Sequence, residues 1–215
     1  MNIRSQTIEN GRAYHIFNRG NNKENLFLDN NDYNHFLNLL SKYILPVAAI
    51  YSWVLLRNHF HLVLQIREDV QYKWPKNMKL SKEANIWETE LISKDIDRRR
   101  VPNASNHFKH LFNAYANYFN LKYNRTGSLF DKPFKRIIIE DERHLVNEIL
   151  YTNSNSVKHG FSNDVFSWQW SSVNDMVKGN SKLIDVDYVK SLFGDIENFR
   201  YVLRNYSDYF ENEFE

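Results

Sequence analysis

The sequence contains no cysteine, which excludes a disulfide framework and a thiolate-bound zinc site. Any metal must therefore be held by imidazole, carboxylate or amide groups, a donor set that favours a hard or borderline cation. Long apolar runs are also missing. No stretch approaches the roughly 20 apolar residues of a membrane span, and the N-terminal segment lacks the apolar centre of a signal peptide. We therefore expect a cytoplasmic protein without a membrane partner.

Charge of a single sign is scarce, because 28 Lys and Arg nearly balance 26 Asp and Glu, for a net charge of +2. A balance this close to zero is weak evidence for a nucleic-acid partner. Basic residues nevertheless recur, as in the triplet at 98–100, and acidic residues gather at 208–215. This distribution fits a cationic face opposed by an acidic tail, and it fits equally well charges that are spread over the whole surface.

Aromatic residues, in contrast, are abundant: 15 Phe, 13 Tyr and 5 Trp make up 15% of the 215 residues. Many of these rings are expected to belong to the core, but exposed rings beside basic side chains commonly hold the bases of single strands. The length fits one domain with an appendage, and 42% hydrophobic residues are ordinary for a globular chain.

The apolar periodicity predicts an α+β fold. Alternating or β-rich segments indicate strands, and apolar residues at helical spacing indicate helices. In chain order we predict a strand at 13–20, a helix at 32–43, strands at 47–58 and 59–67, a helix at 106–123, a strand at 134–141 and a helix from 144 to the VKHG sequence at 157–160. This βαββαβ order is typical of the ferredoxin-like split βαβ fold, which has a central antiparallel sheet. We expect the helices to cover one face of this sheet.

Two segments lie outside that pattern. Residues from about 68 to 106 lose periodicity and contain Pro75 and Pro102, so we expect an insertion or mobile flap with some helix. Apolar residues at helical spacing between 185 and 210 predict a helical tail. We therefore divide the chain into a domain at 1–172, which holds the insertion, and a C-terminal helical extension at 173–215 packed on it.

His59 and His61 form the first candidate site. Side chains two residues apart in a strand point to the same face, so the two imidazoles project together and Phe60 points to the other side. Such a pair suits a divalent metal, whose remaining ligands would be amide or carboxylate oxygens and water. The alternative is that both histidines are structural or surface residues.

Tyr151 and Asn155 form a second candidate pair, four residues apart and so on one face of a helix. A tyrosine hydroxyl can attack phosphorus to form a covalent phosphotyrosine, while a metal polarises the scissile phosphate. Asn155 would complete the metal shell. The alternative is that Tyr151 is a half-buried helix residue and that Asn155 caps the helix end.

Four sequence segments resemble one protein family: YHIFNRGNN at 14–22, WVLLRNHFHLVL at 53–64, YFNLKYNRTGSLF at 118–130 and YTNSNSVKHGF at 151–161. With the WQWSS sequence, the resemblance extends from about residue 12 to 172. The chain resembles the single-tyrosine HUH transposases of the IS200/IS605 type (Y1 transposases), and within them the REP-associated tyrosine transposases.

The resemblance implies an HUH endonuclease fold and a metal-dependent tyrosine transposase, that is, a site-specific endonuclease for single-stranded DNA. Its reaction would cleave and transfer strands through a 5′-phosphotyrosine intermediate at hairpin-flanked sites, as in DNA transposition. The partner would be single-stranded or hairpin DNA, the cofactor Mg²⁺ or Mn²⁺, and the protein a monomer or homodimer. The family positions fall on the nucleophile Tyr151, the metal ligands His59, His61 and Asn155, and the basic Lys158.

Phosphate contacts are expected from the basic residues Arg19, Arg57, Arg136 and Lys158. One departure from the family is Ser156, which stands where relatives usually have proline.

Three other tyrosines, at 115, 118 and 123, compete with Tyr151 as nucleophile, and we predict that they are core or base-stacking groups. Two alternatives to the transposase function remain. The first is a catalytically silent nucleic-acid-binding module of the same fold, and the second is an unrelated hydrolase whose metal activates water.

Overall fold

The computed structural model describes residues 7–211 except 69, 71, 74–98 and 101. Most of the predicted insertion at 68–106 therefore lies outside the described residues. Its described part contains two short antiparallel strands, β4 (Tyr72–Lys73) and β5 (Arg99–Arg100). Among the helices that are described, none combines the length and apolar character needed to cross a bilayer.

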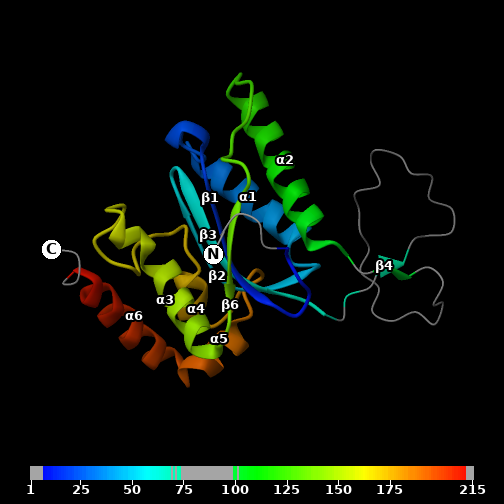
Figure 1. The fold of residues 1–215 in the computed structure, drawn as a ribbon. Helices are drawn as coiled ribbons and strands as arrows, with labels where there is room; N and C mark the ends of the chain where they lie inside the picture. Colours follow the sequence, from blue (N-terminus) through cyan, green and yellow to red (C-terminus); the bar gives the residue numbers. More distant parts are fainter. Residues whose placement is uncertain (1–6, 69, 71, 74–98, 101, 212–215) are drawn as a thin grey trace.

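The centre of the molecule is a four-stranded antiparallel sheet with the spatial order β2-β3-β1-β6 (Figure 1). Its strands are β1 (Ala13–Arg19), β2 (Ala48–Leu56), β3 (His59–Ile66) and β6 (Lys135–Ile139). Helix α1 (Asn30–Tyr43) connects β1 to β2, and α2 (Ala104–Lys122) precedes β6. This topology confirms the predicted ferredoxin-like α+β fold with a central antiparallel sheet.

Helices α1 and α2 cover one face of the sheet. Phe60 of β3 is fully buried on this face, with its ring centroid 5.1 Å from that of Phe36 on α1 and 5.7 Å from that of Phe112 on α2. Helix α2 begins earlier than predicted, because Asn103 caps it by accepting a hydrogen bond from the backbone N–H of Asn106. The core of this layer is built largely from aromatic rings.

The opposite face is covered by α3 (Glu142–Lys158), which packs on β2 and β3 (Figure 1). The prediction that helices cover only one face is therefore wrong. The physical reason lies in β2, where the run at 48–56 is almost entirely buried and needs apolar partners on both sides.

The chain then forms α4 (Val173–Lys178), α5 (Val186–Phe193) and α6 (Ile196–Glu211). The predicted tail helix is split in two at Gly194, whose φ of 82° ends α5. Apolar side chains of α5 and α6 join the same hydrophobic core as the sheet, and α6 packs on α3. These helices are thus packed on the domain, while a boundary at residue 172 stays a prediction.

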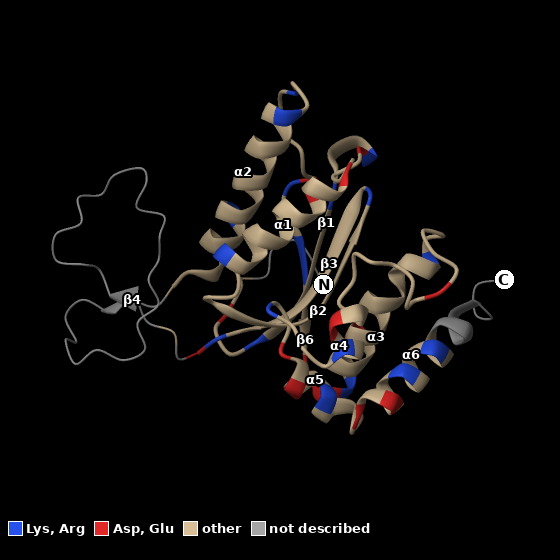
Figure 2. Cartoon of the chain, turned by 180° about the vertical axis from the view of Figure 1, so that it is seen from behind, with Lys and Arg blue, Asp and Glu red and all other residues tan. Residues whose placement is uncertain are grey.

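Charged side chains are interspersed where α5 and α6 are described. Figure 2 shows both basic and acidic residues on each of these helices. The acidic tail at 208–215 lies entirely outside the residues whose side chains are described. Near α5 and α6 the surface therefore follows the expectation of charges of both signs spread over it.

Candidate active site

Strands β1 and β3 and helix α3 together line a cavity of about 500 Å³ at one end of the sheet. His59 and His61 line it from β3, and Tyr151 lines it from α3. The ring centroids of His59 and His61 are 5.3 Å apart, and that of Tyr151 is 5.8 Å from that of His61. Because Phe60 points into the opposite layer, the predicted alternation holds, and the fold brings the histidine pair to the tyrosine.

Hydrogen bonding determines which ring nitrogen each histidine can offer to a ligand. Nδ1 of His59 lies 2.7 Å from Oδ1 of Asn58, and a carboxamide oxygen can only accept, so this nitrogen carries the proton. Nε2 of His59 therefore keeps its lone pair. Nδ1 of His61 lies 2.8 Å from Nε2 of His15, which makes the state of His61 depend on His15.

His15 and Glu148 lie beneath the cavity and were not predicted from the sequence. Nδ1 of His15 is 2.7 Å from Oε2 of Glu148, and the His15 side chain is only 3% exposed. The carboxylate favours the proton on Nδ1, so Nε2 of His15 accepts from the Nδ1–H of His61. Nε2 of His61 is then left with its lone pair. The alternation in YHIF predicts which face of its strand His15 occupies, but it does not predict that His61 lies next to it.

Burial and neighbouring charges change the protonation of these groups. Burial, followed by the charge of His159, lowers the pKa of His59 to about 4. The pKa of His61 is lowered well below its ordinary value, mainly by burial. Burial by itself would raise the pKa of Glu148, but the neighbouring imidazoles of His15 and His144 lower it. The histidine pair is therefore neutral near pH 7 and able to donate lone pairs.

The environment of Tyr151 has the opposite effect, because burial and the charge of Glu148 raise its pKa. Tyr151 is thus a neutral phenol at pH 7. The ammonium group of Lys158 lies 4.7 Å from the centre of the Tyr151 ring, at the exposed end of α3. Lys158 is thereby placed beside the predicted nucleophile, as expected for the adjoining basic position.

Asn155 lies one helical turn after Tyr151 and is fully buried. Its Nδ2 donates to the backbone carbonyl of Tyr151 at 2.6 Å, whereas its Oδ1 has no hydrogen-bond partner among the described residues. A buried amide oxygen without a partner is unusual and is a free acceptor for a cation. Asn155 does not itself line the cavity.

The donor set fits a divalent cation. Nε2 of His59, Nε2 of His61 and Oδ1 of Asn155 are nitrogen and oxygen atoms to which the structure assigns no hydrogen bond within the described ranges. In the described part of the chain, no group of three or more His, Asp or Glu residues could hold a metal by itself. A resident metal would thus need amide, water or phosphate oxygens to complete its shell.

The predicted phosphate-binding residues are not all close to the cavity. Arg19 lines it and also pairs with Asp131 at 2.6 Å. Arg57 is exposed in the turn between β2 and β3, and the guanidinium of Arg136 lies over the ring of Phe134 at 5.1 Å. Neither Arg57 nor Arg136 lines this cavity.

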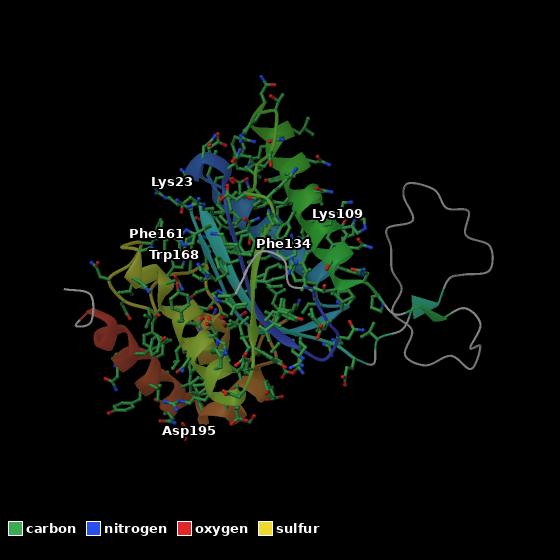
Figure 3. The ribbon with its side chains drawn as sticks, viewed as in Figure 1. Lys23, Lys109, Phe134, Phe161, Trp168 and Asp195 are labelled. Carbon is green, nitrogen blue, oxygen red and sulfur yellow. The ribbon has the colours of Figure 1, made fainter. Side chains whose placement is uncertain are left out.

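Five further polar residues line the cavity and were not predicted from the sequence: Asn18, Lys23, Asn58, Lys135 and His159. Lys23 follows β1 (Figure 3), and Lys135 begins β6. The ring centroid of His159, the residue after α3, is 4.9 Å from that of His59. Strand pairing and the packing of α3 on the sheet bring these positions together.

The competing tyrosines belong to the other layer. Tyr115 is buried and donates to the carbonyl of Leu26 at 2.6 Å. Tyr118 and Tyr123 both donate to the buried carboxylate of Asp32. All three rings come from α2 or its C-terminal end, across the sheet from the histidine pair. Of the two predicted roles, core or base-stacking groups, these hydrogen bonds favour the first.

No family model and no curated protein matches the sequence. Among solved structures, the chain is similar to a REP-associated tyrosine transposase bound to a REP hairpin, with a TM-score of 0.54 and 15% identity. The similarity covers 87% of this chain and 90% of that one. The two proteins share a fold, and the predicted α+β class with a central antiparallel sheet is therefore confirmed.

Proposed function

We propose that the protein is a REP-associated tyrosine transposase that cleaves and rejoins single-stranded DNA beside a hairpin. One observation carries the proposal: Tyr151 faces the same cavity as His59 and His61, although the tyrosine and the histidines come from different elements. The resemblance of the sequence motifs and the shared fold with a hairpin-bound transposase support the same function.

The chemistry would be a transesterification at phosphorus. The Oη of Tyr151 attacks the scissile phosphate, the Oη–P bond forms, and the P–O3′ bond breaks. Tyr151 gives up its proton and the departing 3′ oxygen gains one, so protons balance overall. The strand then carries a free 3′ hydroxyl, and its 5′ phosphate stays on Tyr151. Attack by a 3′ hydroxyl on this phosphotyrosine reverses the step and joins strands.

The raised pKa of Tyr151 makes loss of its proton part of the barrier. His59, His61 and Asn155 would hold Mg²⁺ or Mn²⁺. When bound, the metal would polarise the scissile phosphate. Lys23, Lys135 and Lys158 would place the neighbouring phosphates, since each brings an ammonium group to the cavity or to Tyr151.

A binding module without cleavage is the second candidate. Two observations favour it: burial and the charge of Glu148 raise the pKa of Tyr151, which leaves a neutral and weakly nucleophilic phenol, and Asn155 does not line the cavity.

A denaturing gel separates these functions. The protein is incubated with Mn²⁺ and labelled hairpins that carry single-stranded flanks, and DNA that migrates with the protein is scored. Tyr151→Phe is expected to lose the adduct and keep DNA binding. Tyr118→Phe, a matched change on the other face of the sheet, is expected to keep both. Binding without an adduct would favour the module, and metal-dependent cutting without an adduct would favour a hydrolase.

A further inference from the structure

A second cavity, of about 390 Å³, lies between α2 and the segment at 127–134. Its volume is within the range of small-molecule sites and is sufficient for a nucleobase. Figure 3 shows Phe134 near α2 and Lys109 on that helix. The proposed chemistry uses none of the α2 residues that line this cavity.

Asparagines form one wall of this second cavity. Asn113, Asn117 and Asn120 lie at i, i+4 and i+7 of α2, on the side away from the buried stripe of the helix. Asn120 is engaged, because its Nδ2 donates to the carbonyl of Gly127 at 3.0 Å and its Oδ1 accepts from Arg125. Asn113 and Asn117 are exposed and form no hydrogen bond with the described residues.

Helix stability does not explain these two asparagines. Asparagine is a poor residue for a helix interior, because its side chain competes for backbone hydrogen bonds. Each free carboxamide offers two donors and an acceptor side by side. This arrangement matches the edge of adenine, with which asparagine forms a two-bond pair.

The remaining walls suit a planar base near a phosphate chain. Phe112 and Phe134, whose ring centroids are 5.2 Å apart, give an apolar wall. Lys109 and Lys132 are exposed at this cavity and form no ion pair with the described residues. Aromatic rings with adjacent ammonium groups are the usual combination in sites for single-stranded nucleic acid.

Asn18 links the two cavities, because it lines both. Its Nδ2 donates to the carbonyl of Asp131 at 3.1 Å, and its Oδ1 accepts from the N–H of Arg19 at 2.9 Å. Two hydrogen bonds thus fix the one side chain that belongs to both linings, and the two cavities adjoin at Asn18.

We infer that the second cavity binds one unpaired base of the DNA strand that enters the active site, and that Asn113 and Asn117 read its edge. The inference rests on the proposed function and assigns sequence selection to α2. Lys109 and Lys132 hold the backbone of the same strand without reading its sequence.

The test uses a library of labelled hairpins with randomised single-stranded flanks, and every protein carries Tyr151→Phe so that the proposed reaction cannot cut the probe. The background protein is expected to prefer particular flanks. In Asn113→Ala/Asn117→Ala, that preference falls by about 5- to 150-fold, the discrimination that one two-bond pair provides. The slope of binding against salt stays the same. Lys109→Ala shows the reverse pattern, with a smaller slope and the same preference.

Asn205→Ala is the matched control, because Asn205 is an exposed helix residue of α6 far along the chain from α2. It is expected to keep both affinity and preference. Circular dichroism checks that the double variant is folded, which is expected because alanine is the better helix former. Flank preference that survives in the double variant would overturn the inference, as would a background protein without preference. Failure of the wild-type and background proteins to bind any hairpin would overturn the proposed function as well.

Discussion

Replacing His15 with alanine removes the group that joins His61 to Glu148 beneath the active-site cavity. In the native protein, His15 accepts from Nδ1 of His61 at 2.8 Å and lies 2.7 Å from the Glu148 carboxylate. In His15→Ala, the buried N–H of His61 loses its acceptor. The Glu148 carboxylate, only 17% exposed, loses its nearest partner.

The cost follows from these two unpaired groups. A buried donor without an acceptor costs about 1–3 kcal/mol. Leaving a fully buried charge without its partner costs about 3–5 kcal/mol, but Glu148 keeps some solvent and lies 3.5 Å from His144, so its share is smaller. We expect a total loss of about 3 kcal/mol in the free energy of unfolding. For a chain of this size, the melting temperature would fall by roughly 6–12 °C.

The same change frees His61 to rotate or to change tautomer, so its Nε2 no longer faces the cavity reliably. Loss of such a supporting group typically weakens metal affinity by about 10- to 100-fold. Thermal denaturation and titration of free Mn²⁺ by electron paramagnetic resonance measure the two effects. The matched control is His144→Ala, which removes a contact to Glu148 on the solvent side and leaves His61 untouched. If His15→Ala equals the wild type in melting temperature and Mn²⁺ affinity, the reasoning is refuted.

Two further predictions concern acid and the first turn. Because the pKa of His59 falls from 6.5 in the unfolded chain to about 4 in the folded protein, the unfolded state binds more protons between these values. Stability is therefore complete above pH 6.5 and decreases towards pH 4, by at most about 1.4 kcal/mol per pH unit for this group. Urea titrations at pH 7 and pH 5 measure the decrease, and His59→Asn should reduce it; an equal decrease in both proteins would contradict the assignment. In Gly20→Ala, the new Cβ would lie 2.0 Å from the carbonyl oxygen of Glu24, so the turn that carries Lys23 must move. We expect a loss of about 1–3 kcal/mol and weaker oligonucleotide binding by anisotropy, and unchanged values of both would show that the turn tolerates a side chain.

The order of strands and helices was predictable because it depends on local periodicity. Alternation in HFHLVLQIR required His59 and His61 to share a face, and helical spacing placed Asn155 one turn after Tyr151. The hairpin at Arg57 and the antiparallel sheet followed from the same signals. The sequence by itself therefore determined relations between residues that are close in the chain, and it contained motifs typical of one family.

Only the tertiary structure decided how distant segments meet. Pairing of β1 with β3 places His15 beside His61, 46 residues later in the chain, and α3 adds Glu148 from still further along. The second helical layer was also beyond reach, because a run such as that at 48–56 is apolar whether one or both faces are covered. Periodicity reports which side of an element is buried. Long-range pairing and packing decide which element lies on that side, and local periodicity carries no information about that choice.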